Sequence, residues 1–177
     1  MIARNTDLYG FSCLLDSLGV DPRGKKAVIL GSGGTSKTAR CVLEERGAVP
    51  VVISRSGPVT YEELYALHAD ARLLVNTTPV GMYPNTGASP ARLSRLPLLE
   101  AVFDAVYNPP RTALLLEAEK LGIPHIGGLR MLVAQAAAAS ALFTGKPMAE
   151  ESVLRAIEEK VTVFLAERTH RTEENAN

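Results

Sequence analysis

Residues 28–39 read VILGSGGTSKTA, an apolar run followed by a glycine-rich turn and the start of a helix. A dinucleotide needs this arrangement. Gly31 allows a sharp turn, Gly33 lets the backbone approach the pyrophosphate, and the helix N-terminus presents N–H groups to the negative charge. Gly34 completes the glycine run, and Ser36 takes the third glycine position of the usual fingerprint, where it is small enough for close helix packing. The strand–turn–helix context favours dinucleotide binding over a purely structural turn.

The end of the next apolar run, residues 49–54, indicates which dinucleotide is bound. An NAD site usually has Asp or Glu there, to bond the ribose 2′-hydroxyl. This chain has Ser54, Arg55 and Ser56 instead. A guanidinium flanked by hydroxyls would hold a 2′-phosphate, which a carboxylate would repel. A solvated arginine at a strand end is the alternative, but with the glycine turn upstream we expect NADP as the cofactor.

The remaining sequence alternates short apolar runs with segments of helical periodicity. Buried strands are expected at 27–31, 49–54, 72–78, 101–108 and 123–128, and helices at 6–18, 33–47, 60–67, 109–122, 129–143 and 150–168. The helix caps are expected at Thr6 or Asp7 and at Thr60, and Pro109 and Pro110 are expected at a helix start. This alternation predicts an α/β fold with a Rossmann-like, doubly wound parallel sheet in three α/β/α layers. Residues 79–98, rich in Pro, Gly and Ser, predict a long loop that is either functional or a surface excursion.

Composition excludes several classes of protein. The chain has 177 residues, of which 46% are hydrophobic, and a formal net charge of zero. This length suits one domain with an appended element, and the charge gives no reason to expect nucleic-acid or membrane partners. Cys13 and Cys41 have no spacing that suggests zinc or a disulfide, so we expect no metal and a reducing, cytoplasmic location. We see neither a signal peptide nor a membrane-spanning run.

Six separated motifs occur in one order along the chain. They are NTDLYGF (5–11), GSGGTSKTA (31–39), SRS (54–56), NTTPVGM (76–82), FDAVYNPPRTALLLEA (103–118) and GGLRMLVAQAA (127–137). Together they resemble the cofactor-binding half of the shikimate dehydrogenase family, over residues 5 to about 147. The resemblance implies an NADP-dependent oxidoreductase of aromatic amino-acid and chorismate biosynthesis, which reduces 3-dehydroshikimate to shikimate. Quinate-using relatives share most of these motifs, so shikimate and quinate both stay open as substrates.

The resemblance also implies roles for single residues. Asp7 matches the catalytic aspartate that the family pairs with a lysine at the substrate hydroxyl, and Tyr107 and Gln135 match residues that reach the substrate. The cofactor positions that match are Gly31, Ser32, Gly33, Gly34, Thr35, Ser36, Ser54, Arg55, Ser56, Thr77, Thr78, Ala105, Gly128 and Met131. From the residues alone, a helix cap is the favoured interpretation of Asp7, and a boundary tyrosine with a hydrated hydroxyl is the favoured interpretation of Tyr107. Gln135 either faces a ligand or faces solvent.

In the family, the stretch at 5–11 belongs to a helix that leaves a preceding substrate-binding domain. We therefore expect residues 1–21 to be a linker helix from an absent substrate-binding domain, 22–148 to be the NADP-binding domain, and 149–177 to be a C-terminal helix with a polar tail. The catalytic lysine belongs to the absent domain, and Lys25, Lys26 and Lys37 do not replace it by motif. We expect little activity from this chain alone.

The alternatives are a non-catalytic NADP-binding module and one subunit of a split enzyme. Retention of Asp7, Tyr107 and Gln135 favours descent from an enzyme, because a cofactor sensor has no use for substrate contacts. Without the absent domain, we expect part of the 8–18 helix face or an apolar stripe in the last helix to be exposed, which predicts a homo-oligomer through these helices or docking of that domain. The stripe consists of Leu154, Ile157, Val161, Phe164 and Leu165.

Overall fold

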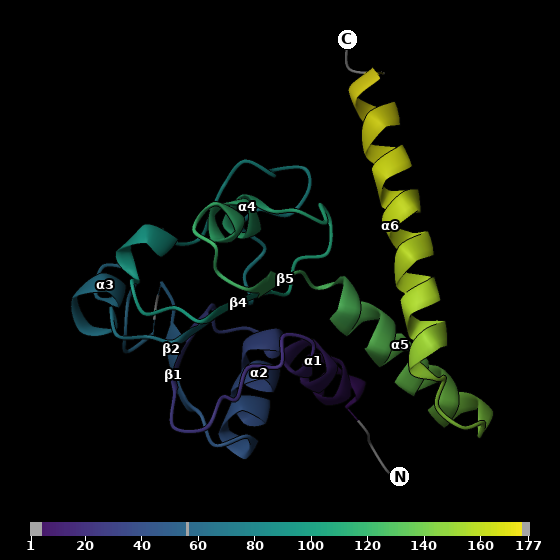
Figure 1. Cartoon of the computed structure of the whole chain (residues 1–177), viewed down its shortest axis with the longest axis horizontal. Helices are drawn as coiled ribbons and strands as arrows, with labels where there is room; N and C mark the ends of the chain where they lie inside the picture. The colour runs from purple at the N-terminus through teal and green to yellow at the C-terminus, as the bar shows by residue number, and fades with distance from the viewer. Residues whose placement is uncertain (1–4, 56, 175–177) are drawn as a thin grey trace.

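The computed structural model describes residues 5–55 and 57–174, and for residues 166–174 the backbone alone. Within these residues one five-stranded sheet has the order β2-β1-β3-β4-β5, with every neighbouring pair parallel (Figure 1). The strands are β1 (Lys26–Leu30), β2 (Val49–Ile53), β3 (Leu73–Asn76), β4 (Ala101–Asp104) and β5 (His125–Ile126). The predicted α/β fold with a Rossmann-like parallel sheet is confirmed.

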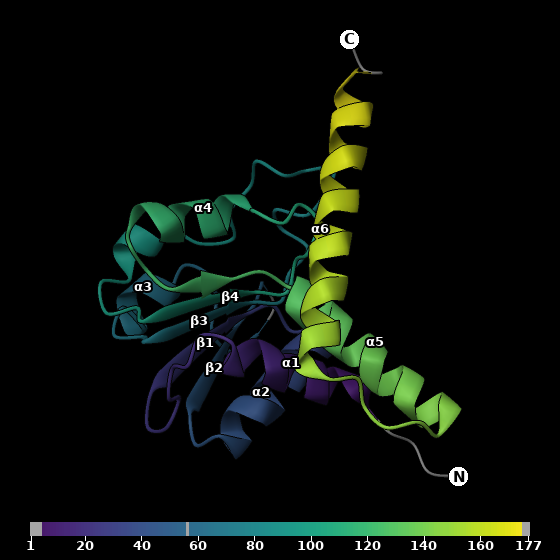
Figure 2. The same ribbon diagram turned by 45° about the vertical axis from the view of Figure 1, so that its right-hand side comes forward.

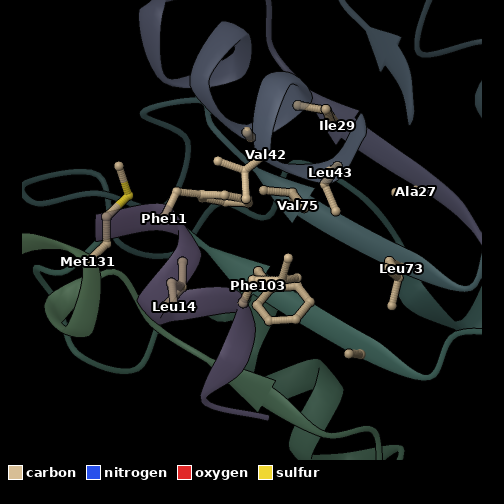
Figure 3. Packing of buried hydrophobic residues seen from close by; sticks show 13 residues of the cluster. Phe11, Leu14, Ala27, Ile29, Val42, Leu43, Leu73, Val75, Phe103 and Met131 are labelled. Carbon is tan, nitrogen blue, oxygen red and sulfur yellow. The ribbon is translucent and has the colours of Figure 1, made fainter. Parts of the chain in front are cut away.

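Three helices cover one face of the sheet, and their apolar side chains meet those of the strands (Figures 2 and 3). Phe11 and Leu14 are fully buried against Phe103 of β4, and Val42 lies in the same cluster. The helices are α1 (Thr6–Asp16), α2 (Gly34–Glu45) and α5 (Leu129–Thr144). Helical spacing of the apolar residues in α1 thus places one continuous stripe on the sheet.

The opposite face of the sheet carries a second core, which completes the three layers. Val28 and Leu30 of β1 point to this side, and Leu64 and Leu114 pack on it from two helices. The elements here are α3 (Leu64–Leu67), α4 (Ala113–Lys120) and a 3-10 turn, η1 (Leu93–Arg95), inside the long loop after β3. Because β1 is buried on both faces, its sequence is continuously apolar rather than alternating.

Three helix starts differ from the prediction. The N-cap of α1 is Asn5, whose side chain accepts from the Asp7 N–H at 2.9 Å, and neither Thr6 nor Asp7 caps it. In α3 only Leu64–Leu67 is helical, and residues 61–63 before it form a turn in which the Glu63 carboxylate accepts from the Thr60 N–H and hydroxyl.

The third difference concerns α4, which begins at Ala113 rather than at the two prolines. The Thr112 hydroxyl accepts from the Leu115 N–H at 3.3 Å and thereby caps this helix. A threonine cap satisfies a backbone donor that Pro109 and Pro110 cannot satisfy with their side chains. The prolines therefore belong to the loop between β4 and α4.

The helix α6 (Glu151–Glu174) stands away from the sheet and projects beyond it (Figures 1 and 2). Arg130 of α5 forms salt bridges to the first turns of α6, with Glu151 at 2.6 Å and with Glu158 at 2.8 Å. Along the predicted apolar stripe, Leu154 is buried whereas Ile157 is 40% exposed. Self-association through this stripe stays a prediction. None of the helices in the described part of the chain combines the length and apolarity that a membrane crossing requires.

Candidate functional site

The carboxyl ends of β1, β2 and β3 border a pocket of about 670 Å³, here named the strand-end pocket. Strand order reverses at this place, because β1 has β2 on one side and β3 on the other. Ligands of open parallel sheets collect at such a switch point. The pocket is lined by Gly31, Ser32, Gly33, Ser54, Arg55, Tyr61, Thr77, Thr78, Pro79, Val80, Ser89 and Pro90.

The glycine turn forms one wall and leads into α2. Gly31 has φ +104°, and a Cβ there would lie 2.9 Å from the Thr77 hydroxyl oxygen and 3.0 Å from the Thr78 methyl. A Cβ added to Gly33 or Gly34 would meet no atom within 4 Å. The turn is therefore pressed against the end of β3 on one side and faces open space on the other. That open space lies at the N-terminus of α2, where unpaired N–H groups favour an anion.

The end of β2 supplies the second wall. Ser54 is buried, and its N–H donates to the Val59 carbonyl at 3.1 Å, which folds the chain back after the strand. Arg55 is exposed and lines the strand-end pocket, whereas Ser56 lies outside the described residues. The described lining residues include no carboxylate. This wall therefore presents one positive charge and no negative one.

The end of β3 supplies the third wall. The Thr77 hydroxyl donates to the Leu30 carbonyl at 2.6 Å, and the Thr78 hydroxyl donates to the Asn76 Oδ1 at 2.7 Å. These bonds fix both threonines beside the glycine turn. Of the other predicted cofactor residues, Gly34, Thr35 and Ser36 continue into α2 outside the pocket lining, with Ser36 buried.

A buried polar network, which the sequence analysis missed, joins the ends of β3 and β4. Asp104 is fully buried and accepts from the Asn76 amide at 2.9 Å, the Val106 N–H at 3.0 Å and the Thr112 hydroxyl at 2.7 Å. Burial raises the pKa of this carboxyl, and the three hydrogen bonds act against that rise. Since Asn76 also accepts from Thr78, the network links the wall of the strand-end pocket at the end of β3 to the loop after β4.

Ala105 and Gly128, two of the cofactor positions implied by the resemblance, lie together outside the lining of the strand-end pocket. A Cβ on Gly128 would lie 2.1 Å from the Ala105 carbonyl oxygen, and the Gly128 N–H donates to the Val106 carbonyl at 2.9 Å. Tyr107 is 40% exposed and shares a hollow of about 210 Å³ with Gly128. The side chain of Met131 instead packs in the core with Phe11 (Figure 3).

The two remaining substrate residues lie where α1 crosses α5. A Cβ on Gly10 would lie 2.7 Å from the Met131 carbonyl oxygen and 3.0 Å from the Gln135 Cβ, so the two helices touch at this glycine. Asp7 is half-buried, one helical turn before Gly10. The Gln135 Oε1 is buried without a hydrogen-bond partner among the described residues. An unpaired buried acceptor is costly, which favours the ligand-facing alternative over the solvent-facing one.

Comparisons with known proteins agree with this geometry. The family profile described as "Shikimate 5'-dehydrogenase C-terminal domain" matches residues 128–158. The chain is 37% identical to the shikimate dehydrogenase (NADP(+)) of Methanopyrus kandleri, over 86% of this chain and 61% of that protein. It is also 37% identical to the enzyme of the same name from Caldicellulosiruptor bescii, over 77% of this chain and 54% of that one.

Solved structures give the same result. Shikimate dehydrogenase 1 from Peptoclostridium difficile superposes with a TM-score of 0.82 and 33% identity, over 92% of this chain and 63% of that one. Shikimate 5-dehydrogenase from Thermus thermophilus, solved in complex with NADP(H) and shikimate, has a TM-score of 0.75 and 32% identity, over 88% and 62% of the two chains.

The fold and the strand-end pocket define a Rossmann-like domain of the kind found in NADP-dependent dehydrogenases. The chain belongs to the shikimate dehydrogenase family. It spans about three fifths of the length of the curated relatives it matches.

Proposed function

We propose that this chain is the NADP-binding portion of a shikimate dehydrogenase-like oxidoreductase. The observation that carries the proposal is the composition of the strand-end pocket. Its walls join an anion-binding turn to the single cation of Arg55 and contain no described carboxylate. A cofactor with a ribose 2′-phosphate fits this arrangement, and a 2′-hydroxyl that needs an acidic partner does not.

Each wall would hold one part of the cofactor. The N–H groups at the start of α2 and the residues Gly31–Thr35 would bind the pyrophosphate, and Ser36 allows their helix to pack closely. Ser54, Arg55 and Ser56 would bind the 2′-phosphate. Thr77 and Thr78 would flank the cofactor on its way to Ala105 and Gly128 at the nicotinamide end, with the core residue Met131 behind them. When bound, NADPH supplies the hydride that reduces a ketone.

The substrate side would use Asp7, Tyr107 and Gln135. Asp7 would give or take the proton of the reacting hydroxyl, Tyr107 would reach the substrate from the loop after β4, and Gln135 would pair its orphaned oxygen with a substrate hydroxyl. The substrate would be 3-dehydroshikimate or shikimate, or quinate. The unpaired cysteines Cys13 and Cys41 support a reducing, cytoplasmic location.

Because the chain spans about three fifths of its relatives, we propose that a substrate-binding domain must complete the site. The partner of this chain would be that domain or, through α1 and α6, a second copy of the chain. The same coverage favours a second candidate, a non-catalytic NADP-binding module or one subunit of a split enzyme. Holding two reactants in register contributes about 7–11 kcal/mol of barrier lowering, which half a substrate site forfeits.

We therefore expect this chain alone, incubated with NADP and shikimate, to produce little or no NADPH absorbance. The control is an NADPH titration of the same sample, which must show binding. Clear turnover by the isolated chain would contradict the need for a further domain and would also remove the non-catalytic candidate.

Replacing Arg55 by alanine should weaken NADPH binding about 10- to 150-fold and leave NADH binding nearly unchanged, because a charge-assisted bond to phosphate contributes about 1.5–3 kcal/mol. Fluorescence titration of each reduced cofactor measures both affinities. Arg40→Ala is the matched control, because Arg40 is exposed on α2 and pairs with Glu44 at 2.8 Å. Equal losses for NADPH and NADH would show that Arg55 does not select the 2′-phosphate.

A further inference from the structure

Tyr61 lies in the wall of the strand-end pocket, although no sequence motif contains it. The side chain is half-buried and packs against the core cluster that includes Val28, Leu30 and Leu64. One part of the ring is therefore anchored to the core while another part borders the pocket. An aromatic side chain held in this way offers a rigid flat surface at low entropic cost.

The rest of the pocket offers no second surface of this kind. Among the described lining residues, Tyr61 is the single aromatic side chain, and the facing loop contributes Pro79, Ser89 and Pro90. Burial raises the pKa of the Tyr61 phenol, and the positive charge of Arg55 acts against that rise. Tyr61 and Arg55 both line this pocket, and both follow β2 in the chain.

The covalent structure of the cofactor determines which of its groups would lie near Arg55 and Tyr61. In a 2′-phosphorylated adenosine the phosphate is carried by C2′ of the ribose and the purine by the neighbouring C1′. A guanidinium that holds the 2′-phosphate therefore brings the purine within a few ångströms of its own neighbours. Tyr61 is the neighbour with a π-face, which stacks on purines.

We infer that Tyr61 is a cofactor-binding residue that stacks on the purine base of the dinucleotide. The inference rests on the proposed NADP-binding function and assigns to Tyr61 a task separate from that of Arg55. Arg55 would bind the phosphate by charge, whereas Tyr61 would bind the base by stacking on its flat face. Stacking on an aromatic side chain survives salt, whereas a charge contact at an exposed arginine is screened.

The test is NADPH titration of Tyr61→Leu, Tyr61→Phe and wild type at low and at high salt. We expect Tyr61→Leu to bind about tenfold more weakly at both salt concentrations, and Tyr61→Phe to bind as wild type does. Arg55→Ala should instead flatten the salt dependence. Tyr65→Leu is the matched control, because Tyr65 packs on the same core but does not line the pocket. Its hydroxyl accepts from the Arg92 N–H, and the Arg95 Cζ lies 4.0 Å from the centroid of its ring.

Each outcome has one meaning. If wild type does not bind NADPH, the proposed function fails. If wild type binds and Tyr61→Leu binds equally well while its melting temperature falls, Tyr61 only supports the core and the inference is overturned. If Tyr61→Phe is as weak as Tyr61→Leu, the hydroxyl rather than the ring makes the contact, which also overturns stacking. Adenosine 2′,5′-bisphosphate, which lacks nicotinamide, should reproduce the loss in Tyr61→Leu.

Discussion

Asp104→Ala should lower the free energy of unfolding by about 3 kcal/mol or more, because three buried donors lose a shared acceptor. The donors are the Asn76 amide, the Val106 N–H and the Thr112 hydroxyl. The Asn76 amide keeps a longer bond of 3.4 Å to the Val80 carbonyl, whereas the Val106 N–H has no other acceptor among the described residues. Chemical denaturation followed by circular dichroism measures the change.

The effect should reach beyond stability, because the network spans two strand ends. Asn76 and Asp104 are register partners in the parallel pairing of β3 and β4, and Asn76 holds Thr78 at the pocket wall. We expect NADPH binding by Asp104→Ala to weaken even well below its melting temperature. Asp21→Ala is the control, since Asp21 pairs with Arg23 in an exposed loop and should leave stability nearly unchanged.

The milder variant Asp104→Asn tests how the stability that Asp104 contributes depends on pH. Burial raises the pKa of Asp104 in the folded state, so the folded protein holds the proton at pH values where the unfolded chain has lost it. The stability that this group contributes is complete below about pH 4 and is lost as the pH rises through the folded pKa. Asparagine does not titrate.

The stability cost of Asp104→Asn should therefore be larger near pH 4 than near pH 7. Unfolding curves of both proteins at matched pH values test this, because titration of all other groups cancels in the difference. A cost that grows with rising pH would mean that the hydrogen bonds outweigh burial and that the folded pKa lies below the unfolded one.

The sheet was predictable because its signals are local. The run at residues 27–31 is continuously apolar and ends in a glycine turn, and this pattern is typical of a strand that is buried on both faces. The start of α4 was not predictable in the same way. Pro109 and Pro110 are common helix openers, but the cap depends on Thr112, whose hydroxyl is also fixed by Asp104 from another element.

Contacts between distant segments explain what the sequence analysis missed at the site. Asn76 and Asp104 are 28 positions apart and become neighbours only through the β3–β4 register. Tyr61 joins the pocket because the chain after β2 folds back through the bond from Ser54 to Val59. Neither Tyr61 nor the pairing of Asn76 with Asp104 follows a spacing rule, so strand order and register were needed to find them.

Gly31→Ala should weaken NADPH binding about 100-fold, because the added Cβ acts on both sides of the phosphate turn. At φ +104° an L-residue is strained by about 1–3 kcal/mol, and the Cβ would lie 2.9 Å from the Thr77 hydroxyl oxygen. That hydroxyl cannot move aside without breaking its 2.6 Å bond to the Leu30 carbonyl. The turn must then shift, and with it the N–H groups at the start of α2 that would bind the pyrophosphate.

Two further glycine variants distinguish backbone strain from steric crowding as the cause of the affinity loss in Gly31→Ala. Gly24 also has a positive φ, at +69°, but a Cβ there meets nothing within 4 Å and it lies before β1. Gly24→Ala should therefore lose stability and keep NADPH affinity. Gly33→Ala should keep stability and lose affinity, since a Cβ would enter only the open space in front of the turn. If Gly31→Ala and Gly33→Ala both bind NADPH as wild type does, the pyrophosphate is not held at this turn and the cofactor must be sought elsewhere on the sheet.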